Sequence, residues 1–512
     1  MSLEIPRQTG PERKSLFFRF LDFIERVGNQ LPDPLTLFAI LAVAVLIISY
    51  FAGRAGLSVI HPGTGKPVAA VNLLTADGIR KILASAVTNF TGFPPLGLVL
   101  VIVLGVGLAE GSGLFAALLR KVVLSTPTWL ATWVIVFMGI QLNAAGDSGF
   151  VVLPPVAGAV YASFGRHPLV GMMAGYAAVA AGFSANLTVN SLDALIAGIT
   201  QSSARLLDPN IVVNPAVNWY FLAVSSFVLT VAGVLVTERI VEPRFGRYQG
   251  SSEKLEPLKP EEEKALKAAG IWTLVYIAII VALCIPPNGL LRNPKTGSLI
   301  VDSGLMNGLV PLVTLLFFIP GYVYGKKAGT IKTDHDLAKL LNQSMATMGG
   351  YIVLAFVIGQ FIAYFNWSNL GLILAISGAN FLKSIGLTGL PLMLGFIVLS
   401  TLINLFVGSA SAKWSVLGPV FVPMLMLLGY SPAFTQVAYR IGDSCTNAIT
   451  PLLPYFVILL GFAKKYDENI GMGTLIAGML PYSIVFLIVW CVLFTIWTLL
   501  GLPLGPGGSI FL

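Results

Sequence analysis

The hydrophobic residues of this chain are concentrated in long apolar runs that alternate with short polar connections. Nine of these runs are candidate membrane spans, for which a helix needs about 20 apolar residues. They cover residues 31–53, 94–113, 168–201, 215–238, 270–285, 305–324, 346–365, 432–463 and 472–500. The pattern predicts an all-α polytopic membrane protein with about nine transmembrane helices.

Two further apolar stretches, 128–164 and 391–428, are nearly two spans long, and small and polar residues interrupt each one at its centre. Irregular backbone at membrane depth is tolerated where it is buried in protein or lines a wet cavity. We therefore expect two re-entrant helical hairpins, each entering and leaving the membrane on one side. Prolines after the hairpin tips and at the start of the next helices recur at a constant offset, 155 with 419 and 168 with 432. This recurrence favours an inverted-repeat transporter architecture.

A long charged connection, 239–269, divides the chain into a first half, 31–238, and a second half, 270–512. Two later connections are also rich in lysine. If all three face the cytoplasm, as the positive-inside rule requires, the N-terminus is cytoplasmic and the C-terminus periplasmic. Residues 1–30 then form a cytoplasmic segment, within which 15–27 have the spacing of an interfacial amphipathic helix.

The composition supports a membrane protein. Of 512 residues, 56% are hydrophobic and only 11% are charged, whereas a soluble domain has about 25% charged residues. The chain contains no HExxH, GxSxG or Walker A motif, and its three cysteines form no CxxC pair. We therefore expect neither an enzyme nor a nucleic-acid partner, and we interpret the net charge of +8 as a signal of topology.

Ionisable residues at membrane depth are few, and each costs about 2.5–3.5 kcal/mol on insertion scales. Asp147 lies at the first hairpin tip and Asp193 in the next helix, whereas Lys413 lies at the second tip and Arg440 and Asp443 in the next helix. These are corresponding places in the two halves. Inverted-repeat transporters bind substrates and ions at such places, so we expect the binding site here.

Two kinds of coupling ion fit these residues. A helix break near Asn447 and Pro451 would free backbone carbonyls beside Asp443, and oxygen ligands suit a hard cation such as sodium. Asp193 has no basic residue within four positions. Burial would then favour its protonated form, which makes it a candidate proton carrier together with Asp443.

Each of these residues also has a structural interpretation. Arg440 and Asp443, three residues apart, would neutralise each other on one helix face. Lys413 would extend its ammonium to a membrane interface. Trp414 would serve as a packing or interfacial ring, and Asp193 would cap a broken helix end.

Four phrases resemble the p-aminobenzoyl-glutamate transporter (AbgT) family of bacteria. They are NAAGDSGFVVLPP at 143–155, ANLTVNSLD at 185–193, SASAKWSVLGP at 409–419 and YRIGDSCTNAITPLLPY at 439–455. The resemblance covers essentially the whole chain. It implies a homodimeric carrier of the bacterial inner membrane, driven by ion gradients, that takes up p-aminobenzoyl-glutamate or exports sulfonamide antimetabolites.

The resemblance also implies functional roles for Asp193, Asn404, Trp414, Arg440, Asp443 and Pro451. We expect the Arg440 guanidinium to bind a carboxylate or sulfonyl oxygen and the Trp414 indole to stack on the aminobenzoyl ring. The expected substrate contacts are Asn143, Asp193, Ser411, Trp414, Arg440 and Pro451, and the expected ligands of a sodium ion are Asn404, Asp443 and Asn447. A passive channel and a membrane subunit of an ATP-driven complex are the alternatives.

Overall fold

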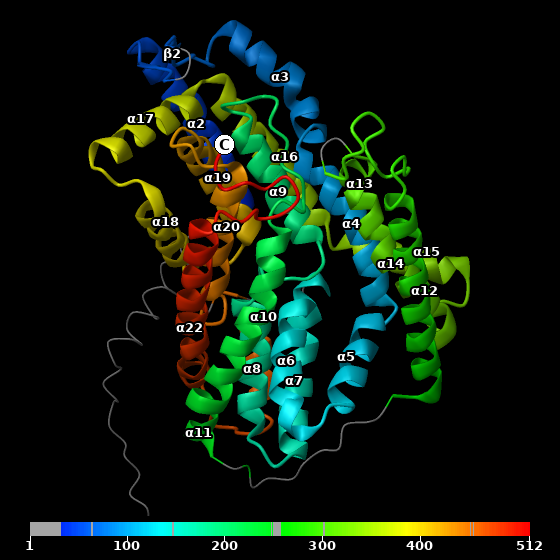
Figure 1. The fold of residues 1–512 in the computed structure, drawn as a ribbon. Coiled ribbons are helices and arrows are strands. Elements are labelled where there is room, and N and C mark those ends of the chain that lie inside the picture. The colour runs from blue at the N-terminus through cyan, green and yellow to red at the C-terminus, as the bar shows by residue number, and fades with distance from the viewer. Residues whose placement is uncertain are drawn as a thin grey trace, which may run out of the picture.

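The computed structural model describes residues 32–62, 65–145, 148–246, 248, 258–300, 303–450, 452–453 and 455–512. Within these ranges the chain is a helical bundle with one antiparallel pair of short strands, β1 (Ser58–Ile60) and β2 (Pro67–Ala69) (Figure 1). The interfacial helix expected at 15–27 lies outside the described residues. So do both Asp147 and Pro451.

Seven helical segments of the described ranges are long and apolar enough to cross a membrane. They are α2 (Pro34–Arg54), α3 with α4 (Ala76–Thr91 and Pro94–Gly111), α10 continuing through a π-helical turn into α11 (Trp219–Val236, Thr237–Val241 and Glu242–Phe245), α12 (Pro260–Cys284), α14 (Leu309–Ala328), α16 (Gly349–Trp367) and α22 (Met472–Leu499). They correspond to seven of the nine predicted spans, which confirms the all-α membrane class.

The other two predicted spans are broken helices. The first forms α8 (Pro168–Ala181) and α9 (Ser191–Ala204), and the second forms α20 (Pro432–Cys445) and α21 (Tyr455–Ala463). The second break lies where Asn447 predicts it, but the prediction of 168–201 as one continuous span was wrong. Helices α8 and α20 correspond to each other, since their starts (168 and 432) and their ends (181 and 445) are both 264 positions apart.

A capping box explains why a new helix begins after the first break. The Asn190 side chain accepts hydrogen bonds from the backbone N–H groups of Leu192 and Asp193, at 2.9 and 3.2 Å. In return, the Asp193 carboxylate accepts the backbone N–H of Asn190. This reciprocal pairing satisfies donors that a helix start otherwise leaves free.

Both predicted hairpins are present. The first consists of α6 (Ala131–Gln141) and α7 (Ser148–Ser163), and the second of α18 (Gly389–Asn404) and α19 (Ala410–Met426). Figure 1 shows α6 and α7 in the lower half of the molecule and α18 and α19 in the upper half, as an inverted repeat requires. Helix α7 packs on α8, and α18 packs on α20.

Gly442 permits the close approach of α18 and α20. A Cβ atom at this position would lie 2.6 Å from the Ile397 carbonyl oxygen and 2.5 Å from the Ser400 Cβ. Because no side chain intervenes, the C-terminal end of α18, at Asn404, lies directly beside the second half of α20.

Several further elements were not predicted. They are α5 (Leu114–Leu124), α15 (Asp334–Ala346), α17 (Leu370–Ser384), the short α13 (Gly304–Asn307) and two 3₁₀ turns (Thr128–Leu130 and Leu142–Ala145). All are too short, too polar or both to be found as membrane spans by hydropathy.

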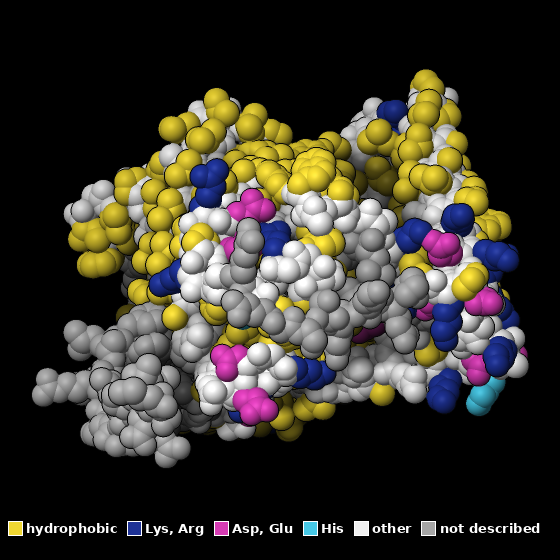
Figure 2. Space-filling model, turned by 90° about the horizontal axis from the view of Figure 1, so that it is seen from below, with side chains coloured by type: hydrophobic (Ala, Val, Ile, Leu, Met, Phe, Trp, Pro, Cys, Tyr) yellow, Lys and Arg dark blue, Asp and Glu magenta, His cyan; other side chains and the backbone are white. Residues whose placement is uncertain are grey.

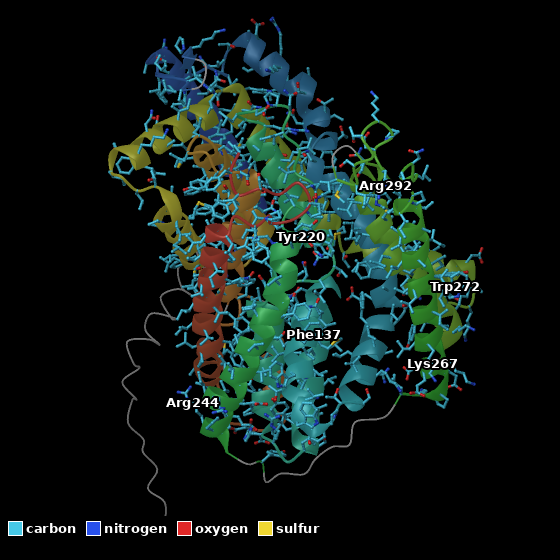
Figure 3. The ribbon with its side chains drawn as sticks, in the orientation of Figure 1. Phe137, Tyr220, Arg244, Lys267, Trp272 and Arg292 are labelled. Carbon is cyan, nitrogen blue, oxygen red and sulfur yellow. The ribbon has the colours of Figure 1, made fainter. Side chains whose placement is uncertain are left out.

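The helices pack into two main hydrophobic clusters. The larger joins the hairpins and broken helices with α10 and α22, and the smaller joins α4, α5, α12 and α14. Helix α12 leaves an apolar side uncovered, where Trp272 is 51% exposed and points away from the bundle (Figure 3). Arg244 and Lys267 mark the lower ends of α11 and α12 (Figure 3), and basic and acidic side chains gather on the lower face (Figure 2).

Candidate functional site

The hairpin tips and the helix breaks meet one another inside the larger cluster. At the first tip, Asn143 Nδ2 donates to the carbonyl of Gly182, which follows α8. The backbone N–H of Ser184, in the same break, donates to the Ser444 hydroxyl near the end of α20. The irregular segments of both halves therefore form one continuous buried polar region.

An ion pair between Arg440 and Asp193 joins the two halves of the chain. Arg440 Nη1 on α20 lies 2.5 Å from Asp193 Oδ1 on α9, and the two side chains are 1% and 3% exposed. Arg440 Nη2 also donates to the Ser184 carbonyl, at 3.3 Å. The alternative in which Arg440 pairs with Asp443 on one helix face was wrong, because the helix directs the two charges to different partners.

Asp193 is bound from several directions. Its Oδ2 accepts the Asn190 backbone N–H at 2.8 Å and the Asn186 amide at 3.1 Å. The capping role considered for Asp193 is therefore confirmed. Asp193 does have a basic partner, Arg440, although the two are 247 residues apart in sequence. Proton carriage by Asp193 stays a prediction.

A second buried ion pair joins hairpin 2 to α20. Lys413 Nζ, in the first turn of α19, lies 2.7 Å from Asp443 Oδ1, and both side chains are 2% exposed. The same ammonium donates to Asn404 Oδ1. The alternative in which Lys413 extends to an interface was wrong, because the buried carboxylate of Asp443 offers the ammonium a partner within reach.

The three residues predicted to bind sodium lie together. Asn404 Nδ2 donates to Asn447 Oδ1 and to the Thr446 hydroxyl, both at 2.9 Å. Asn404 Oδ1 and Asp443 Oδ1 both face the Lys413 ammonium. One side-chain oxygen of each of these three residues thus already faces a donor of the chain itself.

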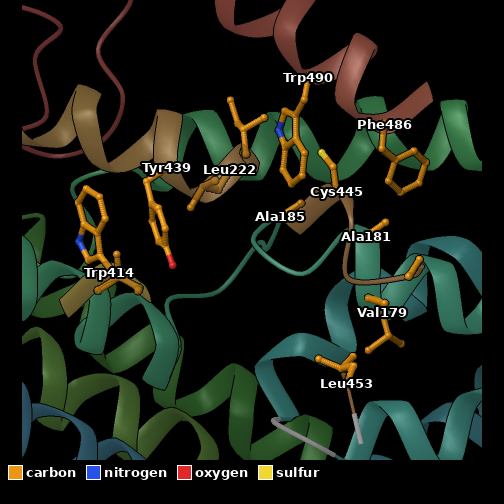
Figure 4. Packing of buried hydrophobic residues seen from close by; sticks show 14 of the residues in the cluster. Val179, Ala181, Ala185, Leu222, Trp414, Tyr439, Cys445, Leu453, Phe486 and Trp490 are labelled. Carbon is orange, nitrogen blue, oxygen red and sulfur yellow. The ribbon is translucent and has the colours of Figure 1, made fainter. Parts of the chain in front are cut away.

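Trp414 and Tyr439 form a closed aromatic pair. The centroids of the two rings are 4.3 Å apart, and the ring planes are nearly parallel (Figure 4). Trp414 Nε1 donates a hydrogen bond to the Thr200 hydroxyl at 2.8 Å. The Tyr439 hydroxyl donates to the Ala410 carbonyl and lies 3.1 Å from Asp443 Oδ1. Sequence reasoning did not select Tyr439. Its position four residues before Asp443, on the same helix face, was the available signal.

A cavity of about 550 Å³ opens beside Lys413, between the start of α2 and hairpin 2. Asp33, Ser409 and Lys413 contribute polar groups to its otherwise largely apolar lining. Ser411 is half-buried, with its hydroxyl 3.3 Å from that of Ser409. Among the described residues, Lys413 is thus the basic group that lines this cavity.

Comparisons with known proteins agree along nearly the whole chain. Residues 19–512 match the model of the AbgT transporter family. The p-aminobenzoyl-glutamate transport protein of Escherichia coli (strain K12) is 39% identical over 486 residues, which cover 95% of this chain and 96% of that protein.

Two solved structures have the same fold. The YdaH transporter of Alcanivorax borkumensis, described as having an unusual topology, is 42% identical, with a TM-score of 0.89 over 93% of this chain and 100% of that one. MtrF of Neisseria gonorrhoeae, described as illuminating a class of antimetabolite efflux pumps, is 45% identical, with a TM-score of 0.91 over 96% of this chain and 100% of that one. With its paired hairpins and broken helices, this chain is therefore a multi-pass membrane protein that belongs to the AbgT family of transporters.

Proposed function

We propose that this chain is a secondary transporter, driven by an ion gradient, of p-aminobenzoyl-glutamate and related aminobenzoyl compounds, including sulfonamide antimetabolites. The observation that carries the proposal is the position of the two buried ion pairs. Each joins elements that are separate in the chain: α20 with α9, and hairpin 2 with α20. The names of the E. coli and N. gonorrhoeae relatives support this substrate class.

The ion pairs suggest how an anionic substrate is bound. A substrate carboxylate can take the place of Asp193 on the Arg440 guanidinium, which suits planar, bidentate recognition of carboxylates. Arg440 Nε is buried and has no hydrogen-bond partner in the described part of the chain, so one donor is free for a substrate oxygen. Binding would release the contact between α20 and α9 and allow these elements to move.

In the described conformation Tyr439 covers the Trp414 ring, so a substrate cannot stack on the same face. The Trp414 indole is fully buried and its ring is stacked on Tyr439. Stacking of the substrate ring on Trp414 therefore requires that hairpin 2 move away from α20. Such a movement is the kind expected of alternating access around a central site.

Coupling to a cation gradient follows from the charge of the substrate. Import of two carboxylates against 100 mV costs about 4.6 kcal/mol, at about 2.3 kcal/mol per charge. Cotransported protons or sodium ions would offset this cost. Export of a neutral sulfonamide requires no such compensation, and proton exchange through Asp193 or Asp443 would drive it.

We further propose a homodimer in the bacterial inner membrane, with the N-terminus in the cytoplasm and the C-terminus in the periplasm. The uncovered apolar side of α12 is suited to lipid or to a second copy. The charged ends of α11 and α12 lie on the lower face (Figure 3), which supports placing this face in the cytoplasm.

Reconstitution of the purified chain alone in liposomes tests the proposal against its alternatives. A secondary transporter accumulates labelled p-aminobenzoyl-glutamate above equilibrium, saturably, only when a sodium or pH gradient is applied. A channel would equilibrate the compound without saturation. A subunit of an ATP-driven complex would remain inactive under every gradient.

A further inference from the structure

We propose that the ammonium of Lys413 is the cation that this site holds, and that it excludes sodium from the oxygens of Asn404 and Asp443. The inference concerns equilibrium binding at the site, so it stands apart from the proposed substrate and can fail or succeed independently of it. Lys413 of hairpin 2 would then be the permanent counter-ion of Asp443 on α20.

Lys413 bridges two elements of the site through its ammonium. Its Nζ lies 2.7 Å from Asp443 Oδ1 and donates to Asn404 Oδ1, so one ammonium binds an oxygen from α20 and an oxygen from the end of α18. Burial leaves 2% of each charged side chain exposed. Under these conditions the lysine replaces solvent as the partner of the Asp443 carboxylate.

Hydrogen bonds fix the orientation of the Asn404 amide. Its Nδ2 donates to both Thr446 Oγ1 and Asn447 Oδ1, and the Thr446 hydroxyl in turn donates to the Thr401 carbonyl. This arrangement directs Asn404 Oδ1 towards Lys413. It also gives Asn447 Oδ1 a donor, so one side-chain oxygen of each predicted sodium ligand already faces a donor of the chain.

The charges of the two buried ion pairs balance each other. Among the residues that the structure describes, the polar region contains two carboxylates, Asp193 and Asp443, and two basic groups, Arg440 and Lys413, each paired with one carboxylate. A sodium ion added beside Asp443 would lie against an ammonium of the same sign, and this repulsion is strong where the dielectric constant is low. The residues therefore do not fit a resident sodium ion while Lys413 is in place.

The cavity beside hairpin 2 gives the Lys413 side chain room to move. Lys413 lines it, together with Asp33 at the start of α2. Lysine has a flexible four-carbon stem and a compact charge, so it can leave one partner for another without repacking of the helices. The tethered cation can thus be withdrawn from Asp443 into the cavity, a movement that a resident arginine would not make as readily.

Sodium binding by the purified full-length chain tests this inference. Radioactive sodium is titrated in detergent at constant ionic strength, and the melting temperature is followed with sodium or choline as the salt. The unchanged chain should bind no sodium that depends on Asn404 or Asp443. Lys413→Met should gain saturable sodium binding at least tenfold tighter than the unchanged chain, and Lys413→Met combined with Asp443→Asn should lose it.

Lys383→Met, which removes an exposed lysine from the end of α17, is the matched control and should behave like the unchanged chain. If Lys413→Met does not fold, the unchanged chain and Asn404→Ala still decide the question. Saturable sodium binding by the unchanged chain that Asn404→Ala removes would overturn the inference. Failure of a folded Lys413→Met variant to bind sodium more tightly would also overturn it.

Discussion

Two double-mutant cycles compare the energetic coupling of Arg440 to Asp193 with its coupling to Asp443. The cycle with Asp193 uses Arg440→Met, Asp193→Asn and the double variant, and the cycle with Asp443 uses Asp443→Asn in the same way. The Arg440 and Asp193 side chains are 1% and 3% exposed and 2.5 Å apart. Removal of one member of such a pair leaves a buried, uncompensated charge and should cost about 3–5 kcal/mol of stability.

The coupling energies should differ between the two cycles. Contacting residues in one network couple by about 0.5–3 kcal/mol, and the close contact places Arg440 and Asp193 towards the upper end of that range. A side-chain pair three residues apart on a helix is worth only about 0.2–0.5 kcal/mol, so Arg440 and Asp443 should couple weakly. Asparagine at 193 keeps an oxygen for the capping box, so the first cycle isolates the charge.

The assay is reversible chemical unfolding of the purified protein in mixed micelles, followed by circular dichroism. The free energy of unfolding is measured for the unchanged chain, each single variant and each double variant. A larger coupling energy between Arg440 and Asp443 than between Arg440 and Asp193 would refute the pairing described here, and with it the proposed release of α20 from α9.

Three further predictions concern the surroundings of the site. Trp414→Phe keeps an aromatic ring but removes the donor to Thr200, so it should cost about 1 kcal/mol or more in unfolding free energy with little change in substrate KM, because a phenyl ring can still stack on the aminobenzoyl ring; a large rise in KM would contradict a contact that any aromatic ring can make. Arg166→Met breaks the bidentate contact with Glu242, at 2.7 and 2.5 Å, and should speed hydrogen exchange in α11, whereas unchanged exchange would contradict this role. Deletion of residues 509–512 removes backbone hydrogen bonds to the turn before α20 and should speed exchange at 429–434; equal protection would show that the tail does not hold this turn.

The hairpins and the second helix break were predictable from local sequence. Both apolar stretches carry small and polar residues at their centres, and the Pro and Gly pattern repeats between the halves. The break before Asp193 was less visible, because Gly182 and Asn190 are common in continuous helices of membrane proteins as well. The capping box formed by Asn190 and Asp193 was its decisive physical cause.

The charge partners were not predictable from sequence spacing. Arg440 is three residues from Asp443 in sequence, yet it pairs with Asp193, and Lys413 takes Asp443 instead. The choice depends on how α9 and hairpin 2 pack against α20, which is a tertiary property. The same packing encloses Trp414 and brings Tyr439 to Asp443.

The most direct test of the central claim is equilibrium binding of p-aminobenzoyl-glutamate to the purified chain, measured by titration calorimetry for the unchanged protein, Arg440→Lys and Arg166→Lys. The site described here predicts saturable binding to the unchanged protein and to Arg166→Lys, because Arg166 lies away from the helix breaks in contact with Glu242. Arg440→Lys should bind at least tenfold more weakly, since an ammonium cannot reproduce the planar guanidinium. Equal affinity of Arg440→Lys and the unchanged protein would contradict the assignment of the substrate site to the helix breaks.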